Sequence, residues 1–243
     1  MNQITNVFSL LELDAEDDRV HVDHVKDTED GEKGRGKHGG AGSSNGTLDT
    51  AKEGQWQYGE NLTLPLAWID LEMTGLDIEN DRILEIACIM TNGSLSKSIE
   101  GPDLVIHQSQ ACLDKMGAWC QTHHGASGLT KRVLQSTITE HEAEKQVIKF
   151  VKEHIGDFTP LLAGNSVYVD LLFLKKYMPN LASLFPHVLV DVSSINALCV
   201  RWFPREKKKK PLKEGKHRAM DDIRESIAEL KYYKENIFKT SKK

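Results

Sequence analysis

The sequence predicts an α/β protein in which a mixed sheet of five strands is flanked by helices. Three strand-like apolar segments come first along the chain, with no helical pattern between them. Two shorter apolar segments follow, and helical patterns separate them from what precedes and from each other. Adjacent strands followed by strands with helical crossovers imply a mixed sheet covered by helices on both sides. A chain of 243 residues, of which 39% are hydrophobic, is long enough to bury such a core.

The first three strands are predicted at residues 64–73, 82–91 and 98–107. The second and third form a hairpin, because the Asn92-Gly93 pair between them favours the positive φ angles of a type I′ turn. The two shorter strands are predicted at residues 161–163 and 188–191.

Helical patterns fill the segments between and after these strands. The helix with the clearest ends opens at Thr139-Glu140-His141-Glu142, which reads as a capping box, and closes at Gly156. Apolar residues at helical spacing within it predict one buried face. The other helices are expected in five places: residues 111–120, from residue 131, and at 168–177, 193–202 and 218–233.

Residues 1–60 differ in composition from the rest of the chain. They hold 13 acidic and 6 basic residues, and residues 38–46 are rich in glycine and serine. Such a segment has too few apolar residues to form a core, so we predict a disordered leader. A single domain at residues 64–238 and a short basic tail at 239–243 complete the predicted organisation.

The net charge and the cysteines narrow the class of protein. The formal net charge of −5 comes from the leader, because the remainder holds 23 acidic and 25 basic residues. A nearly neutral domain argues against a protein that coats long nucleic acid through its net charge. The 4 cysteines show no paired spacing, which indicates a reducing compartment. No membrane is expected, because no apolar run approaches the roughly 18–20 residues of a membrane helix.

Two carboxylates in the first strand are the most informative local feature. Asp70 and Glu72 lie two positions apart, so their side chains point to the same face of that strand. Two acids side by side in apolar surroundings repel each other and are costly to bury. A divalent cation between them removes this cost, because hard cations such as Mg²⁺ are held by carboxylates. The pair alone is a weak signal.

Three further residues of the same chemistry follow downstream. Asp170 follows Gly164-Asn165-Ser166 at the start of a predicted helix, and His217 precedes the Asp221-Asp222 pair near the start of the last helix. Four carboxylates and a histidine are the groups that a two-metal phosphodiesterase needs, with the imidazole taking a proton from water. Taken alone, Asp170 is explained equally simply as an acid at a helix N-terminus, where the helix macrodipole favours negative charge. Spacing alone does not choose between Asp221 and Asp222.

The order of these motifs resembles the DEDD exonuclease superfamily in its histidine-bearing branch, and within it the oligoribonuclease family. The resemblance runs from about residue 64 to 238. It rests on residues 68–76, 119–125, 127–130, 164–166, 176–179, 191–193 and 217–226. It implies a ribonuclease H-like fold and two Mg²⁺ or Mn²⁺ ions. By the same resemblance, the metal-binding acids are Asp70, Glu72, Asp170 and Asp222, and His217 is the general base.

The resemblance also implies a short single-stranded RNA as substrate and a homodimer. Leu76 and Trp119 then contact the terminal bases, while His124 and Ser166 lie near the 5′ phosphate. One departure from the family stands at Pro186-His187-Val188, where many members carry a Tyr-Arg pair that closes the phosphate pocket. A valine cannot act as a cation there, so a weaker preference for the shortest substrates is expected. The basic run at residues 207–210 is either a solvated loop or a surface that steers phosphates.

The function that these expectations describe is a 3′→5′ exoribonuclease that degrades short oligoribonucleotides to nucleoside monophosphates. The alternatives are an exonuclease of broader specificity that also cleaves DNA, and a catalytically inactive module that binds RNA ends. The expected location is the cytoplasm, since an acidic leader is unlike a mitochondrial presequence. Mitochondrial import by an atypical signal is the alternative.

Overall fold

The computed structural model describes residues 62–207, 209–211 and 218–238. The predicted disordered leader at residues 1–60, the basic tail at 239–243 and the predicted general base His217 all lie outside the described residues.

The five predicted strands form one mixed sheet, which confirms the fold class. They are β1 (Leu66–Met73), β2 (Ile83–Thr91), β3 (Ser98–Val105), β4 (Leu161–Gly164) and β5 (Leu189–Asp191), in the order β3-β2-β1-β4-β5. β1, β2 and β3 pair antiparallel, while β4 is parallel to both β1 and β5. β1, which carries Asp70 and Glu72, is therefore the central strand.

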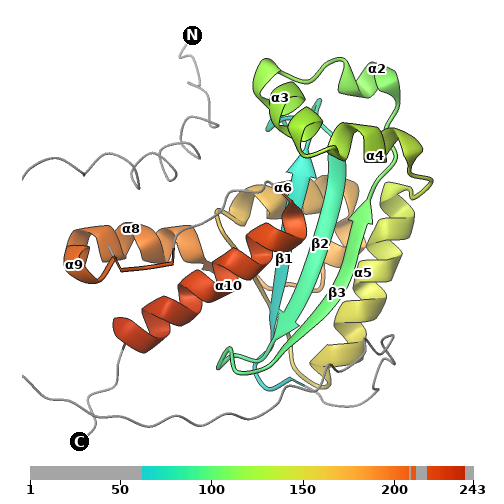
Figure 1. Ribbon diagram of the computed structural model, residues 1–243. Helices are drawn as coiled ribbons and strands as arrows, with labels where there is room; N and C mark the ends of the chain where they lie inside the picture. Colours follow the sequence, from blue (N-terminus) through green and yellow to red (C-terminus); the bar gives the residue numbers. More distant parts are fainter. Residues whose placement is uncertain (1–61, 208, 212–217, 239–243) are drawn as a thin grey trace, which may run out of the picture. The chain divides into compact units, whose positions relative to one another are not determined.

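Helices cover both faces of this sheet. They are α2 (Gln110–Leu113), α3 (Ala118–Ala126), α4 (Leu129–Gln135), α5 (Glu140–Ile155), α6 (Tyr168–Tyr177), α7 (Pro179–Ala182), α8 (Val192–Trp202), α9 (Pro204–Lys207) and α10 (Ala219–Asn236). Figure 1 shows α10 crossing β1 and β2, α5 running beside β3, and α3 near the tip of the β1 arrow. The short helices predicted around residues 111–120 are α2 and α3, and α7 and α9 were not predicted. No helix of the described residues is long and apolar enough to cross a membrane.

Side-chain alternation along β1 divides the core into two layers. Ile69 and Leu71 pack with α5, α6 and α7 on one face, and Leu66 and Trp68 pack with α8 and α10 on the other. Because residues two apart share a face, Asp70 continues the row of Leu66 and Trp68. The carboxylates of β1 therefore project toward α10.

The start of α5 forms one half of the predicted capping box. The Thr139 hydroxyl accepts a hydrogen bond from the Glu142 amide at 3.2 Å. The Glu142 carboxylate accepts a bond from Gln146 Nε2 at 3.1 Å, so the reciprocal half is not formed among the described contacts. Gly156 ends the helix with a φ of 55°, which a residue without a Cβ adopts at little cost.

The hairpin between β2 and β3 is confirmed, but its predicted type I′ turn is wrong. Asn92 and Gly93 are not among the described residues with positive φ; Leu95 is, at 59°. Asn92 Oδ1 accepts bonds from the amides of Ser96 and Lys97, which organises a longer loop. Leu95 is only 7% exposed and packs in the α10 layer. Burial of this side chain explains why the chain takes a wider loop than the Asn-Gly pair favours.

Candidate active site

The acidic pair of β1 lies where the strand continues beyond its parallel neighbour. β1 pairs with β4 only from Leu66 to Trp68, so Asp70 and Glu72 follow after β4 has ended. On the other side β1 remains paired with β2, where Glu72 lies opposite Glu85. The end of a strand that outlasts its neighbour is open to ligands, as expected at the carboxyl ends of strands in α/β sheets.

Asp222 joins this pair from α10. Asp70, Glu72 and Asp222 each offer one carboxylate oxygen, and these oxygens all lie within 4.8 Å of one another. The adjacent Asp221 instead forms an ion pair with Arg224 at 2.8 Å. The geometry thus chooses between two neighbouring acids that spacing along the chain could not separate.

Asp170 closes the open edge of β1 from the first turn of α6. Its side chain is buried, and its Oδ1 accepts a hydrogen bond from the Leu71 amide at 3.0 Å. This bond lies just beyond the last residue of β1 that pairs with β4, so the carboxylate takes the place of a strand partner. Asp170 is not a member of the three-carboxylate group, but after burial its charge has the largest effect in raising the pKa of Asp70.

Burial and mutual repulsion make these acids hard to ionise together. Burial raises the pKa of Asp70 well above its usual value, and the charges of Asp170, Asp222 and Glu72 raise it further. The pKa of Glu72 is raised by burial and then by Asp222, against a lowering by Arg218. Burial likewise raises the pKa of Asp170 to about 8. Such a cluster gains most from a bound cation.

The donor set suits a hard divalent metal. The three clustered side chains offer carboxylate oxygens only, and all three are partly buried. Mg²⁺ and Mn²⁺ prefer carboxylate oxygen to nitrogen or sulfur ligands. The acidic cluster is therefore compatible with binding a divalent cation.

A further buried carboxylate, Glu85 on β2, was missed by the sequence reasoning. It is fully buried and lies on the same face as Ala87 and Ile89, toward α10. Arg218 donates two hydrogen bonds to its carboxylate, from Nη2 at 2.8 Å and from Nε at 3.2 Å. Arg132 adds a third contact at 3.3 Å. The only signal in the sequence was a lone acid within an otherwise apolar strand.

His124 of α3 lies beside the acidic cluster. It is 1% exposed, its Nε2 bonds the Met73 carbonyl oxygen at 2.9 Å, and its Nδ1 lies 3.9 Å from a Glu72 oxygen. These contacts fasten α3 to the end of β1. Its predicted place near a 5′ phosphate stays a prediction.

Trp119 and Leu76 come from the two segments that this contact joins. Trp119 lies one turn before His123 on α3, and the two rings stack with centroids 3.9 Å apart and planes 20° from parallel. Leu76 follows the end of β1 in a loop held by a bond from the Thr74 hydroxyl to Asp81 Oδ1 at 2.7 Å. Both predicted base-contacting side chains are half-buried.

Ser166 is fixed at the end of β4 in a strained conformation. Its φ of 47° is unusual for a residue with a side chain. Its amide donates to Asp191 Oδ1 at 3.0 Å and to the Ser193 hydroxyl at 3.1 Å, and its own hydroxyl donates to Ser193 at 3.1 Å. Strain of this kind is common at binding sites, and the substrate role of Ser166 stays a prediction.

The predicted basic loop is only partly available to a substrate. Lys210 is buried, and its Nζ lies 3.4 Å from Glu229 Oε1 on α10. Lys209 is exposed. At the point of departure from the family pattern, His187 and Val188 are both exposed ahead of β5.

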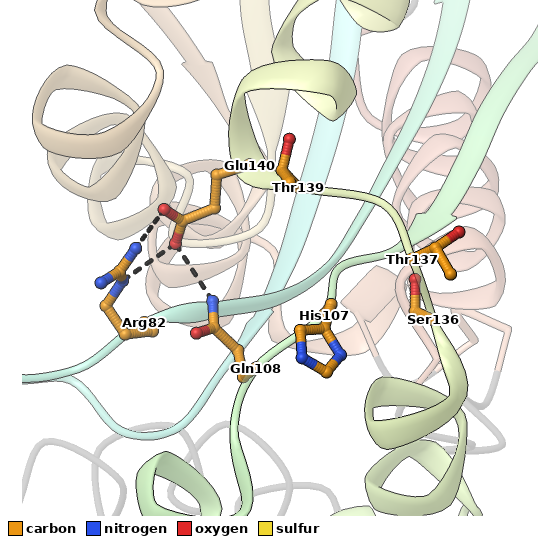
Figure 2. A pocket seen from close by; sticks show the side chains of 7 residues that line it. All are labelled: Arg82, His107, Gln108, Ser136, Thr137, Thr139 and Glu140. Carbon is orange, nitrogen blue, oxygen red and sulfur yellow. Dashed lines mark hydrogen bonds and ion pairs between the residues drawn. The ribbon is translucent and has the colours of Figure 1, made fainter.

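Figure 2 shows the side chains that line a cavity of about 490 Å³. Arg82, Gln108 and Glu140 line it, and none of the clustered carboxylates does. Arg82 Nε and Gln108 Nε2 both donate to Glu140 Oε1, at 3.0 and 3.2 Å. These contacts hold the first turn of α5 against the start of β2. They give Arg82, Gln108 and Glu140 a structural role.

Comparisons with known proteins show the family of this chain. A family model described as Exonuclease matches residues 67–230. An oligoribonuclease of Arabidopsis thaliana is 59% identical over 239 residues, covering 98% of this chain and 99% of that protein. A protein of Homo sapiens named "Oligoribonuclease, mitochondrial" is 49% identical over 181 residues, covering 74% of this chain and 76% of that protein.

Solved structures agree at the level of the fold. An exonuclease I from Methylocaldum szegediense superposes with a TM-score of 0.56 at 17% identity, over 72% of this chain and 41% of that one. A zinc-bound complex of E. coli ExoI with single-stranded DNA superposes with a TM-score of 0.53 at 14% identity, over 73% of this chain and 42% of that one. The fold and the acidic cluster thus define a protein of the exonuclease class. Within that class, the chain belongs to the oligoribonuclease family.

Proposed function

We propose that this protein is a 3′→5′ exoribonuclease that degrades short oligoribonucleotides to nucleoside monophosphates by two-metal-ion hydrolysis. The observation that carries the proposal is the convergence of Asp70, Glu72 and Asp222 at the open end of β1, in a chain of the oligoribonuclease family. Carboxylates at this spacing have little structural use, because burying them together weakens the fold.

Asp70, Glu72, Asp170 and Asp222 are the residues that would hold the metal ions. Three of them already lie within 4.8 Å of one another, and Asp170 lies on the adjoining edge of β1. Mg²⁺ and Mn²⁺ are the proposed ions, because the three clustered residues offer carboxylate oxygens as ligands. When bound, such ions neutralise charge that develops on the phosphate and lower the pKa of water.

His217 is the proposed general base. It precedes Arg218, and Arg218 is fixed to Glu85 at the start of α10, one turn before Asp222. A histidine there takes a proton from water, because its ordinary pKa lies near working pH. The support for the assignment is the place of His217 in the sequence, five residues before Asp222, in a chain of the oligoribonuclease family.

The proposed substrate is a single-stranded RNA of two to a few nucleotides. Leu76 and Trp119 would contact the terminal bases, and both are half-buried on segments that meet at the end of β1. His124 and Ser166 would define the side of the 5′ phosphate. Base–aromatic stacking tolerates any sequence, which suits an enzyme that clears mixed fragments.

Two other functions make different predictions. The structural neighbours include exonuclease I bound to single-stranded DNA, but at 14% identity this likeness concerns the fold alone. An inactive RNA-end-binding module is disfavoured, because the acids that such a module does not need are present and clustered.

Titration of the purified protein with three labelled substrates separates these functions. A dinucleotide, a twenty-residue RNA and a DNA of the same length are incubated with Mg²⁺ or with EDTA. The proposal expects fastest cleavage of the dinucleotide, only with metal, and little cleavage of DNA. Equal cleavage of DNA supports the broader exonuclease, and binding without cleavage supports the inactive module.

A homodimer is proposed as the working form. The support from this structure is an exposed apolar stripe on α8, where Leu198 and Trp202 are 43% and 65% exposed. Residues four apart lie on one side of a helix, so the two side chains form one surface. We propose that a second copy of the chain packs against this surface. Light scattering at micromolar concentration tests this, and a monomer there would contradict the dimer.

The domain limits and the compartment are also proposals. We place the exonuclease domain at residues 64–238, and expect a chain lacking residues 1–60 to fold and cleave as the full chain does. The cytoplasm is the proposed location, because the leader is acidic. The mammalian relatives that carry "mitochondrial" in their names make the mitochondrion the alternative. Imaging of the full chain with a C-terminal tag decides between them.

A further inference from the structure

The first turn of α10 is held by a carboxylate from another element. Arg218 is the N-cap of α10, and no side chain of its own caps the helix. Glu85 Oε2, from β2, instead accepts the Ala219 amide at 3.4 Å. The same carboxylate receives both bonds of the Arg218 fork, at 2.8 and 3.2 Å. A bidentate fork fixes direction as well as distance, so Glu85 sets where α10 begins.

A short chain of contacts leads from Glu85 to Asp222. The Asp222 amide donates to the Arg218 carbonyl oxygen at 3.0 Å, so the two residues lie in one helical turn. β2 carries Glu85 directly opposite Glu72 of β1. Movement of Arg218 relative to β2 therefore moves Asp222 relative to Glu72 and Asp70.

Burial makes this arrangement stiff. Glu85 is fully buried, while Arg218 is only partly exposed. A buried carboxylate has a strong penalty for losing its partners, so the fork stays closed in the folded protein. Arg132 adds a second guanidinium, which contacts Glu85 Oε1 at 3.3 Å.

We infer that Glu85 is a positioning residue for the metal site, which it sets by holding Arg218 and thereby the Asp222 carboxylate at the correct distance from β1. The inference rests on the proposed metal site. Glu85 itself need not touch metal or RNA, because both of its oxygens are engaged by the Arg218 fork.

The chain provides a matched control on the same helix. Arg224, also on α10, forms a second fork with Glu100 of β3, at 2.9 and 2.8 Å. This fork is exposed, and it ties α10 to the same sheet. Glu100→Gln disrupts the fork of Arg224, which does not involve the acidic cluster. Glu85→Gln disrupts the fork of Arg218, which lies one helical turn from Asp222.

The test measures metal binding directly, by electron paramagnetic resonance of free Mn²⁺ during a titration of each full-length variant. Glu85→Gln is expected to weaken Mn²⁺ binding about 10–100-fold, the usual effect of losing a group that orients metal ligands. Glu100→Gln is expected to stay within about 3-fold of wild type, since surface forks contribute little. At saturating metal, Glu85→Gln should leave the KM for a dinucleotide unchanged.

Other outcomes separate failure of the inference from failure of the proposed site. Wild-type Mn²⁺ affinity in Glu85→Gln, or equal weakening in both variants, overturns the positioning role. Asp70→Asn is titrated alongside: if it too binds Mn²⁺ normally, the metal site itself is misplaced. If Glu85→Gln does not fold by circular dichroism, Arg218→Lys decides, because it keeps the charge and loses the fork. Wild-type affinity in Arg218→Lys then overturns the inference.

Discussion

Asp170 Oδ1 accepts a hydrogen bond from the Leu71 amide at 3.0 Å, and this contact joins α6 to the strand that carries Asp70 and Glu72. It satisfies a backbone donor that β4 is too short to reach. The same carboxylate adds its charge to that of Asp70. One side chain therefore closes the sheet edge and, when it is ionised, adds to the negative charge of the site.

Replacement of Asp222 should remove activity, while replacement of its neighbour should not. Asp222→Asn is expected to lower Mg²⁺-dependent cleavage of a dinucleotide by about 1000-fold or more, since a metal supplies several kcal/mol of transition-state stabilisation. Asp221→Asn is the control, because Asp221 pairs with Arg224 on the exposed side of α10. Steady-state kinetics of both variants checks this. Equal rates in the two variants would refute the choice of Asp222.

The metal-free protein should lose stability as pH rises. Burial raises the pKa of Asp170 to about 8, above the ordinary value of 3.8, so the folded state binds its proton more tightly than the unfolded state. Folding then takes up protons between about pH 4 and pH 8, and the free energy of unfolding falls with pH across that window. Urea unfolding in EDTA should show a decrease of at least about 1.4 kcal/mol, the equivalent of one pKa unit.

Asp170→Asn provides the control for this pH dependence. The amide cannot ionise, so the variant should be more stable than wild type at pH 8 in EDTA, with a shallower dependence on pH. A slope equal to that of the wild type would show that other groups cause the effect.

His217→Ala should slow the reaction without weakening substrate binding. A lost general base typically costs about 10²–10⁴ in rate. The wild-type rate should rise with pH as the imidazole loses its proton, and this limb should be missing from the variant. Single-turnover rates from pH 5 to 9 provide the measurement. A variant with the wild-type pH profile would mean that another group accepts the proton.

Trp119→Ala should affect short substrates most. Loss of base stacking costs roughly 1–3 kcal/mol, which corresponds to about a 5–150-fold rise in the dissociation constant of a dinucleotide. A twenty-residue RNA has further contacts and should lose less. Phe158→Ala is the control, as it removes an exposed aromatic ring three residues after the end of α5. Fluorescence anisotropy with an uncleavable dinucleotide measures the effect, and an unchanged dissociation constant would remove Trp119 from the binding site.

The sequence predicted the parts of the site that follow from short-range spacing. Asp70 and Glu72 lie on one face of the central strand because strand side chains alternate with a period of two. Asp221 and Asp222 could not be separated in this way, since only the packing of α10 on β1 brings Asp222 inward.

Glu85 was missed for a related reason. Its partners lie 47 and 133 residues further along the chain, at Arg132 and Arg218, and no local pattern connects them. The turn at Asn92 was predicted wrongly because tertiary burial of Leu95 overrode a local preference. Long-range packing, rather than propensity, accounts for both failures.

The most direct test of the central claim follows the products of a five-residue RNA labelled at its 5′ end, cleaved by wild type and by Asp70→Asn in a single turnover series. With Mg²⁺, wild type should shorten the labelled RNA one nucleotide at a time. Labelled products of four, three and two residues should appear before the labelled mononucleotide. EDTA or Asp70→Asn should leave the RNA intact. Immediate release of labelled mononucleotide, internal cuts, or wild-type shortening by Asp70→Asn would contradict a 3′→5′ exoribonuclease built on this acidic cluster.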